Sequence, residues 1–142
     1  MSASRLVLAG ALLLAACASA SPSADPPSIP AGVAHAWLRT DAGGAVRSAP
    51  ADATRYTITF EAGGRALLRL DCNRGATRWV QDGASLTLLP AVAATKMKCP
   101  DGTLDAAFIA DLARIDRWRL DAGQLVLTGN DGTTMRFRAL PR

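Results

Sequence analysis

The chain has 142 residues, with 16 lysines and arginines, 12 aspartates and glutamates and one histidine, which gives a formal net charge of +4. A basic balance of this kind suggests nucleic acid as a partner for a cytoplasmic protein, but the export signal described next excludes that partner. Once the N-terminal segments are set aside, about 110 residues remain, which is enough for one domain with one core.

Residues 1 to 16 predict a signal peptide of the lipoprotein type. Arg5 supplies a positive charge, and Leu6 to Ala16 is a run of about 11 residues without a charge. This run is too short to span a bilayer, which takes roughly 20 apolar residues. It ends in Leu-Ala-Ala-Cys, which resembles the lipobox of bacterial lipoproteins, so Cys17 is the predicted lipidation site. An ordinary signal peptide with an incidental cysteine is the alternative.

A tether and a folded domain are expected after the signal peptide. Residues 17 to 32 join the lipidated cysteine to a stretch rich in Pro, Ser and Ala, a composition typical of a linker. Residues 33 to 142 are the predicted domain. Because no aspartate follows Cys17 to signal retention in the inner membrane, we expect anchoring in the outer membrane, with the domain in the periplasm or at the surface.

The domain alternates apolar and polar residues with the period of β-strands. Residues 56 to 60 and 66 to 70 predict a hairpin across an Ala-Gly-Gly turn, and residues 76 to 80 and 85 to 89 predict another across Asp82-Gly83. Short runs near Trp118, Leu125 and Phe137 predict a three-strand meander, and a further strand is expected around Trp37.

One segment has helical spacing instead. Its apolar positions are Leu104, Ala107, Phe108, Leu112 and Ile115. Thr103 is a plausible N-cap, and Asp105 would stand in the first turn. The expected fold is mainly β: a small antiparallel β-barrel or strongly curved sheet of about seven or eight strands, with one amphipathic helix over an open end or face.

Two cysteines remain after lipidation, Cys72 and Cys99. In an oxidising periplasm this even number of cysteines predicts a disulfide. Two buried free thiols are the alternative. A zinc site is disfavoured because neither cysteine has a C-x-x-C partner and the chain has one histidine.

Several short motifs, in their order and spacing, make residues 35 to 140 similar to the META (HslJ-like) family. They are the pair Trp37-Leu38, the turn with Cys72, Asn73 and Gly75, and the cluster Thr95, Met97 and Cys99, followed by the helix and the last strand pair. The resemblance implies a small β domain of the bacterial envelope, often lipid-anchored and linked to heat shock or stress, without an agreed enzymatic activity.

The motif residues also have structural interpretations. Asn73 suits a left-handed or Asx turn and Gly75 a positive φ, so turn geometry is sufficient to explain both. Thr95 and Met97 are interpreted as capping and packing residues.

Catalysis is not expected. His35 lies at the edge of the tether, where we expect a solvated or rim position, and several aspartates occur in Asp-Gly turns. No nucleophile motif, phosphate loop or metal-ligand spacing appears, so no cofactor, metal or catalytic residue is predicted. Six arginines fall on the outward phase of predicted strands and could meet anionic groups, although a dispersed solvated surface is the simpler interpretation: Arg65, Arg69, Arg117, Arg119, Arg136 and Arg138.

The sequence therefore predicts a membrane-anchored envelope lipoprotein that acts as a binding, interaction or stress-response module. The expected partners are the membrane, through the lipid, and either an envelope protein or a small amphiphile between sheet and helix. The alternative is an inhibitor of a periplasmic hydrolase, a lysozyme or a protease, which would need a protruding loop.

Overall fold

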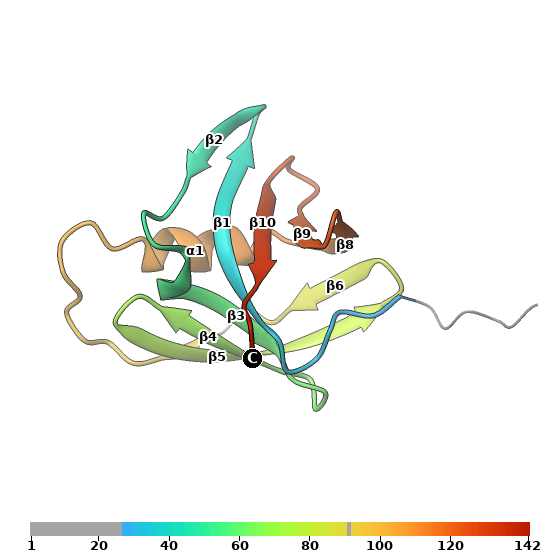
Figure 1. Cartoon of the computed structure of the whole chain (residues 1–142), viewed down its shortest axis with the longest axis horizontal. Coiled ribbons are helices and arrows are strands. Elements are labelled where there is room, and N and C mark those ends of the chain that lie inside the picture. Colours follow the sequence, from blue (N-terminus) through green and yellow to red (C-terminus); the bar gives the residue numbers. More distant parts are fainter. Residues whose placement is uncertain (1–26, 91) are drawn as a thin grey trace, which may run out of the picture.

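The computed structural model describes residues 27–90 and 92–142, and Cys17 with its predicted signal peptide lies outside this range. Within the described residues the chain forms ten β-strands, one α-helix and a short 3-10 helix (Figure 1). In chain order the elements are β1 (Ala34–Ala42), β2 (Ala45–Ser48), η1 (Ala53–Arg55), β3 (Tyr56–Phe60), β4 (Arg65–Leu70), β5 (Asn73–Asp82), β6 (Ser85–Leu88), β7 (Ala93–Ala94), α1 (Asp105–Leu112), β8 (Arg117–Asp121), β9 (Gln124–Thr128) and β10 (Thr134–Ala139).

Eight antiparallel strands close into a barrel in the order β10, β9, β8, β6, β5, β4, β3, β1. Pairing of β10 with β1 closes the ring, and its register sets Trp37 opposite Phe137. The short strands β2 and β7 lie outside this ring and pair with β1 and β5. This arrangement confirms the predicted mainly β fold with about eight strands and one helix.

The predicted hairpins are confirmed because their alternation matches the observed register. Tyr56 pairs with Leu70 and Phe60 with Ala66 across β3 and β4, which keeps the apolar side chains of both strands on the inner face. The turn between β5 and β6 places Gly83 at a φ of 57°, a value that suits glycine. The C-terminal meander is strands β8, β9 and β10.

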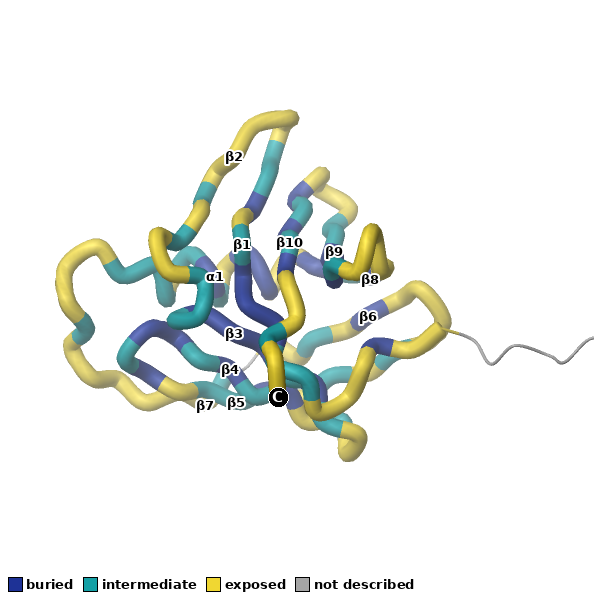
Figure 2. The backbone as a smooth tube through the Cα atoms, in the orientation of Figure 1, coloured by how far each residue is buried: buried dark blue, intermediate teal, exposed yellow. Residues whose placement is uncertain are grey.

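The core fills the barrel from strands and helix together, as the dark segments of Figure 2 show. The rings of Trp37 and Phe108 stack at 5.0 Å, and Phe108 also meets the rings of Tyr56 and Phe137 at 6.0 and 6.2 Å. The indole N–H of Trp37, which would otherwise be unpaired in the core, donates to Thr40 Oγ1 at 3.1 Å. Helix α1 is therefore held by the one aromatic side chain that it inserts, Phe108.

The start of α1 differs from the prediction. The N-cap position is Leu104, without a side-chain cap, and Thr103 Oγ1 instead lies 3.4 Å from the hydroxyl oxygen of Tyr56. The backbone N–H of Leu104 donates to the same Tyr56 oxygen at 2.8 Å. A strand side chain thus satisfies the end of the helix, and Thr103 is not the cap. The helix ends at Leu112, and Ile115, predicted on the same face, is buried in the following turn.

His35 is buried, so the prediction of a solvated or rim position is wrong. Strand β1 begins at Ala34, and His35 lies between Ile58 of β3 and Ala139 of β10. Only 3% of the residue is exposed. At this position β1 is flanked by β3 on one side and by the last residue of β10 on the other.

The last part of the predicted tether packs on the barrel. Ile29 is buried in the core, and its backbone N–H donates to Gln81 Oε1 at 3.0 Å. The amide of Gln81 also donates to the carbonyl oxygen of Pro27, at 3.0 Å. The chain therefore joins the barrel beside the β5–β6 hairpin, and the packed region begins before residue 33 (Figure 1).

Candidate binding site

The side chain of Asn73 holds the segment of residues 95 to 99 against the start of β5. Its Oδ1 accepts from Thr95 Oγ1 at 2.9 Å and from the backbone N–H of Met97 at 2.8 Å. Its Nδ2 donates to the carbonyl oxygen of Met97 at 3.1 Å and reaches Cys99 Sγ at 3.3 Å. Thr95 Oγ1 also accepts from the backbone N–H of Arg74 at 3.0 Å. The structure thus brings Asn73, Thr95 and Met97 together, and Asn73 joins two segments of the chain.

Cys72 and Cys99 are joined by a disulfide, with Cα atoms 5.5 Å apart. The bridge lies next to the Asn73 contacts and ties the turn between β4 and β5 to the loop before α1. In the turn itself Asp71, and not Asn73, has the left-handed backbone, with a φ of 60°. Asp71 is buried and forms an ion pair with Arg55, so this turn is fixed by charge as well as by the disulfide.

Gly75 is needed for space and not for a positive φ, which corrects the prediction. A Cβ built at Gly75 would lie 3.0 Å from Leu70 Cδ1 and 3.1 Å from Val92 Cγ1. Those distances are shorter than ordinary van der Waals contact. The glycine therefore lets the chain after β6 pass close to β5. Together with Trp37 in the core, Asn73, Gly75 and Thr95 act in the fold, whereas the Met97 side chain is 60% exposed.

The motif cluster forms one wall of an open groove against α1. The groove encloses about 470 Å³. Lys96, Met97 and Lys98 line one side, and Asp105, Ala106 and Ile109 of α1 line the other, with Leu70, Asn73, Val92, Ala94 and Thr95 completing it. Apolar side chains thus lie between two lysines and one aspartate, a lining that suits a partner with both apolar and charged groups.

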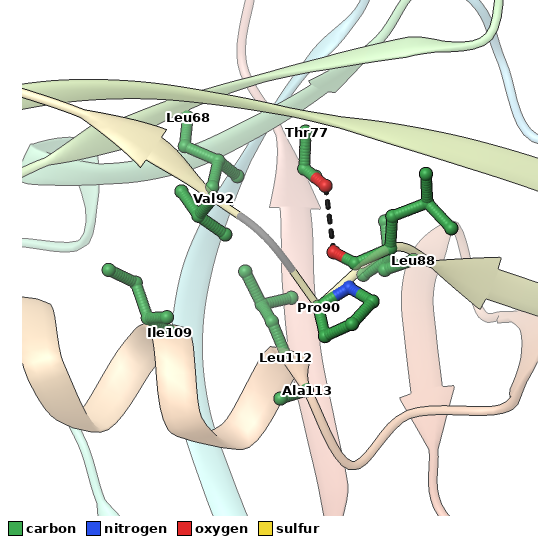
Figure 3. Close-up of a pocket in the computed structure, with 9 residues that line it drawn as sticks. Leu68, Thr77, Leu88, Pro90, Val92, Ile109, Leu112 and Ala113 are labelled. Carbon is green, nitrogen blue, oxygen red and sulfur yellow. Dashed lines mark hydrogen bonds between the residues drawn. The ribbon is translucent and has the colours of Figure 1, made fainter.

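The space enclosed between the helix and the sheet is much smaller. Figure 3 shows it between Ile109 and Leu112 of α1, with Ala113 just after the helix, and the apolar side chains of Leu68, Leu88 and Val92. Its volume is about 20 Å³, and a hydrogen bond of 2.8 Å from Thr77 Oγ1 to the carbonyl oxygen of Leu89 runs beside it. That volume accommodates a water molecule but not an acyl chain. The open hollows at the surface of the described residues are larger.

Two titratable groups with shifted pKa values, His35 and Asp131, lie away from the groove. Burial lowers the pKa of His35, so the ring is neutral near pH 7, but it is enclosed between strands and away from the groove. The Asp131 carboxylate accepts a hydrogen bond from the backbone N–H of Thr133, two residues later, and thereby stabilises the turn. This bond, supported by Arg114, lowers the pKa of Asp131 to about 2. Within residues 27–90 and 92–142 no group of three His, Cys, Asp or Glu side chains could hold a metal ion.

Two arginines that sequence reasoning did not single out, Arg74 and Arg78, project from β5 opposite Arg69 and Arg65 of β4. Their spacing of four residues in a strand places them on one face, but only the strand register shows which residues they oppose. No helix in the described part of the chain is long and apolar enough to cross a membrane.

Comparison with known proteins finds one matching family model and two similar solved structures. The model of the META domain matches residues 31–141 of the chain. An NMR structure of a protein from Burkholderia xenovorans is similar with a TM-score of 0.63 and 22% identity, over 87% of this chain and 99% of that chain. A crystal structure of a DUF4847-family protein from Bacteroides vulgatus is similar with a TM-score of 0.52 and 18% identity, over 74% of this chain and 90% of that one. No curated protein matches the chain.

Proposed function

The chain belongs to the META domain family, and from this premise we propose that it is a lipid-anchored envelope protein whose domain binds a partner in the groove beside α1. META domains are not known as an enzyme family. The proposed role is therefore recognition, in normal growth or under envelope stress, without catalysis.

The groove is the observation that carries this proposal. Its walls are fixed independently, because Asn73 and the disulfide hold the loop while Phe108 holds the helix. A preformed site binds with less loss of conformational entropy than one that must order on binding. The exposed Met97 side chain adds an adaptable apolar contact between Lys96 and Lys98. These features favour an envelope protein with an acidic, partly apolar segment.

The proposed anchor accounts for the place of action. The lipobox-like ending at Cys17 and the uncharged run before it support export and lipidation, and the residues after Cys17 support the outer membrane. A diacylglycerol and an amide-linked chain bury enough CH₂ groups, at about 0.8 kcal/mol each, to make attachment lasting.

Capture of the partner from the envelope tests the groove. The full-length chain, carrying a C-terminal affinity tag, would be cross-linked in cells and isolated, and its partners quantified by mass spectrometry. Ala106→Trp fills the groove with an indole, and we expect at least about tenfold less of any groove partner, which corresponds to about 1.4 kcal/mol. Ala51→Trp is the matched control, because Ala51 is also exposed but lies outside α1 and does not line the groove.

The control should retain the wild-type partners. Equal capture by both variants would reject the groove as the binding site.

One further outcome would favour the hydrolase inhibitor: a captured lysozyme or protease whose capture does not change with Ala106→Trp. The β1–β2 hairpin makes that role sterically feasible, since it projects from the barrel with Gly43 and Gly44 at its tip and Val46 exposed (Figure 2).

A further inference from the structure

Four arginines occupy directly opposed positions on the outer face of β4 and β5. The antiparallel register sets Arg65 opposite Arg78 and Arg69 opposite Arg74. Like charges in directly opposite positions destabilise a sheet. The arrangement therefore costs the barrel stability, and core packing does not require it because the inward positions of β4 are the alternate residues Ala66, Leu68 and Leu70.

Three of these arginines also lack the neutralisation found elsewhere. Six other arginines form ion pairs with aspartates: Arg39, Arg47, Arg55, Arg114, Arg119 and Arg136. Within the described part of the chain Arg65, Arg74 and Arg78 form none, and all three are exposed. Arg69 is half-buried and lies close enough to Asp52 to contribute to the lowered pKa of that carboxyl group. Among the four opposed arginines, the unneutralised charge is therefore on Arg65, Arg74 and Arg78.

Apolar side chains lie between these charges. Leu67 of β4 is opposite Ala76 of β5, between the two arginine pairs. A shallow hollow of about 470 Å³ extends from Arg65 to Arg74 over Leu67, Ala76 and Ala93. A second, of about 340 Å³, lies between Arg65 and Arg78 beside Leu89. We call Arg65, Arg74 and Arg78, with Leu67 and Ala76 between them, the arginine face.

The point where the chain joins the barrel places this face near a membrane anchor. Pro27 and Ile29 bind Gln81, which follows Arg78 by three residues on the same strand, or about 10 Å. Pro27 is ten positions after Cys17, and ten residues span at most about 36 Å. A lipid on Cys17 would therefore keep the arginine face within a few nanometres of the bilayer surface.

From the opposed arginines, the apolar floor between them and this attachment point, we infer that the arginine face docks on the phosphate headgroups of an anionic lipid membrane. The guanidinium groups bind the phosphates bidentately, and Leu67 and Ala76 contact the less polar region beneath them. The inference relies on the proposed anchor for the source of the lipid, but it concerns a different surface from the groove beside α1.

Vesicle binding by the domain without Cys17 separates this surface from the anchor. Residues 27–142 contain the whole barrel and its described core, and circular dichroism would establish that this fragment folds before vesicles are added. Sedimentation would compare vesicles of equal parts phosphatidylglycerol and phosphatidylcholine with vesicles of phosphatidylcholine alone. We expect binding to the anionic vesicles, weakening as salt is added.

The double variant Arg65→Gln with Arg78→Gln should bind these vesicles about 30-fold more weakly, because each arginine near an anionic surface contributes about fivefold. The matched control is Arg117→Gln with Arg138→Gln, which removes the same charge from exposed arginines of β8 and β10 that form no ion pair with another described residue. The control should bind within about threefold of wild type.

Equal loss in both double variants would overturn the inference, since net charge alone would then explain binding. Binding of polyglutamate or inorganic phosphate without binding of vesicles would overturn it as well, in favour of an acidic partner or a free anion. Circular dichroism of each variant would establish that the barrel is intact. Failure here leaves partner capture by the groove unaffected, so the two proposals fail separately.

Discussion

Asn73 shows how a single side chain can fix a loop that has no secondary structure of its own. Its amide satisfies both the N–H and the carbonyl group of Met97, together with the hydroxyl of Thr95. An aspartate would lose the donor, and an alanine would leave these groups without their partner at about 1 to 3 kcal/mol each where they are buried. The geometry therefore requires an amide at this position.

At the same scale, His35 should make stability depend on pH. Burial lowers its pKa below the ordinary value of 6.5, so the unfolded chain takes up the proton at a higher pH than the folded chain. The stability associated with the neutral ring is complete above pH 6.5 and is lost as pH falls through 6.5 toward the folded pKa. Urea unfolding at about pH 7.5 and about pH 5 should show a loss for wild type that is smaller in His35→Gln.

Substitution by alanine gives a second measure of the same residue. His35→Ala should cost about 1 to 3 kcal/mol at neutral pH, since it empties a position that is 3% exposed. Asn130 is exposed and of similar polarity, and Asn130→Ala should change the free energy of unfolding by less than about 0.5 kcal/mol. A cost equally small for His35→Ala would mean that the ring is solvated, as the sequence alone suggested.

The roles of single residues were the least predictable part of the site. The sequence marks Asn73 and Gly75 as constrained, because these residue types suit special backbone geometry. In the structure the left-handed residue is Asp71, and Gly75 is constrained by Leu70 and Val92. Such constraints come from segments distant in sequence, which local residue preferences do not report.

Among the elements, the disulfide is the clearest test of how the site is held together. Cys72 and Cys99 are 27 positions apart, and on the chain-entropy model a bridge closing a loop of this size stabilises by about 3 to 4 kcal/mol. Replacing both cysteines with alanine should therefore lower the free energy of unfolding by about 2 to 5 kcal/mol. Chemical denaturation of the exported domain, with and without reductant, measures this loss.

The thiol count provides the control for that measurement. The exported domain without Cys17 should contain no free thiol after denaturation in the absence of reductant. Two alkylated cysteines per chain would contradict the bridge. In that case the contact of Asn73 Nδ2 with Cys99 Sγ would be a packing contact with a thiol, and the double substitution should cost far less.

Elements were more predictable than residues because their signals are local. The alternation in residues 56 to 70 and the Asp82-Gly83 turn identify two hairpins, since a one-residue slip would turn every apolar side chain outward. The N-terminus of α1 was not predictable in the same way. Its first backbone N–H groups are satisfied partly by Tyr56, which lies 48 positions away.

For the whole molecule, lipidation at Cys17 is the test that decides whether the protein is anchored in a membrane. Cells expressing the full-length chain should incorporate labelled palmitate and retain the protein in the outer-membrane fraction. Cys17→Ser should take up no label, because the serine hydroxyl does not replace the thiol in lipid transfer. The exchange of Ser19 for alanine is the control and should leave labelling unchanged. Identical detergent partitioning of wild type and Cys17→Ser would reject the anchor.

The closure of the barrel between its first and last strands affects the order of folding. His35 pairs with Ala139, a contact between positions about 100 residues apart in the chain. A chain that crosses a membrane N-terminus first presents β1 long before β10 is available. Until the last strand emerges, the edges of β1 and β9 that β10 later covers stay unpaired, and such edges promote aggregation. If the chain is exported as proposed, it should therefore need protection during translocation, because the ring can close only after β10 has crossed.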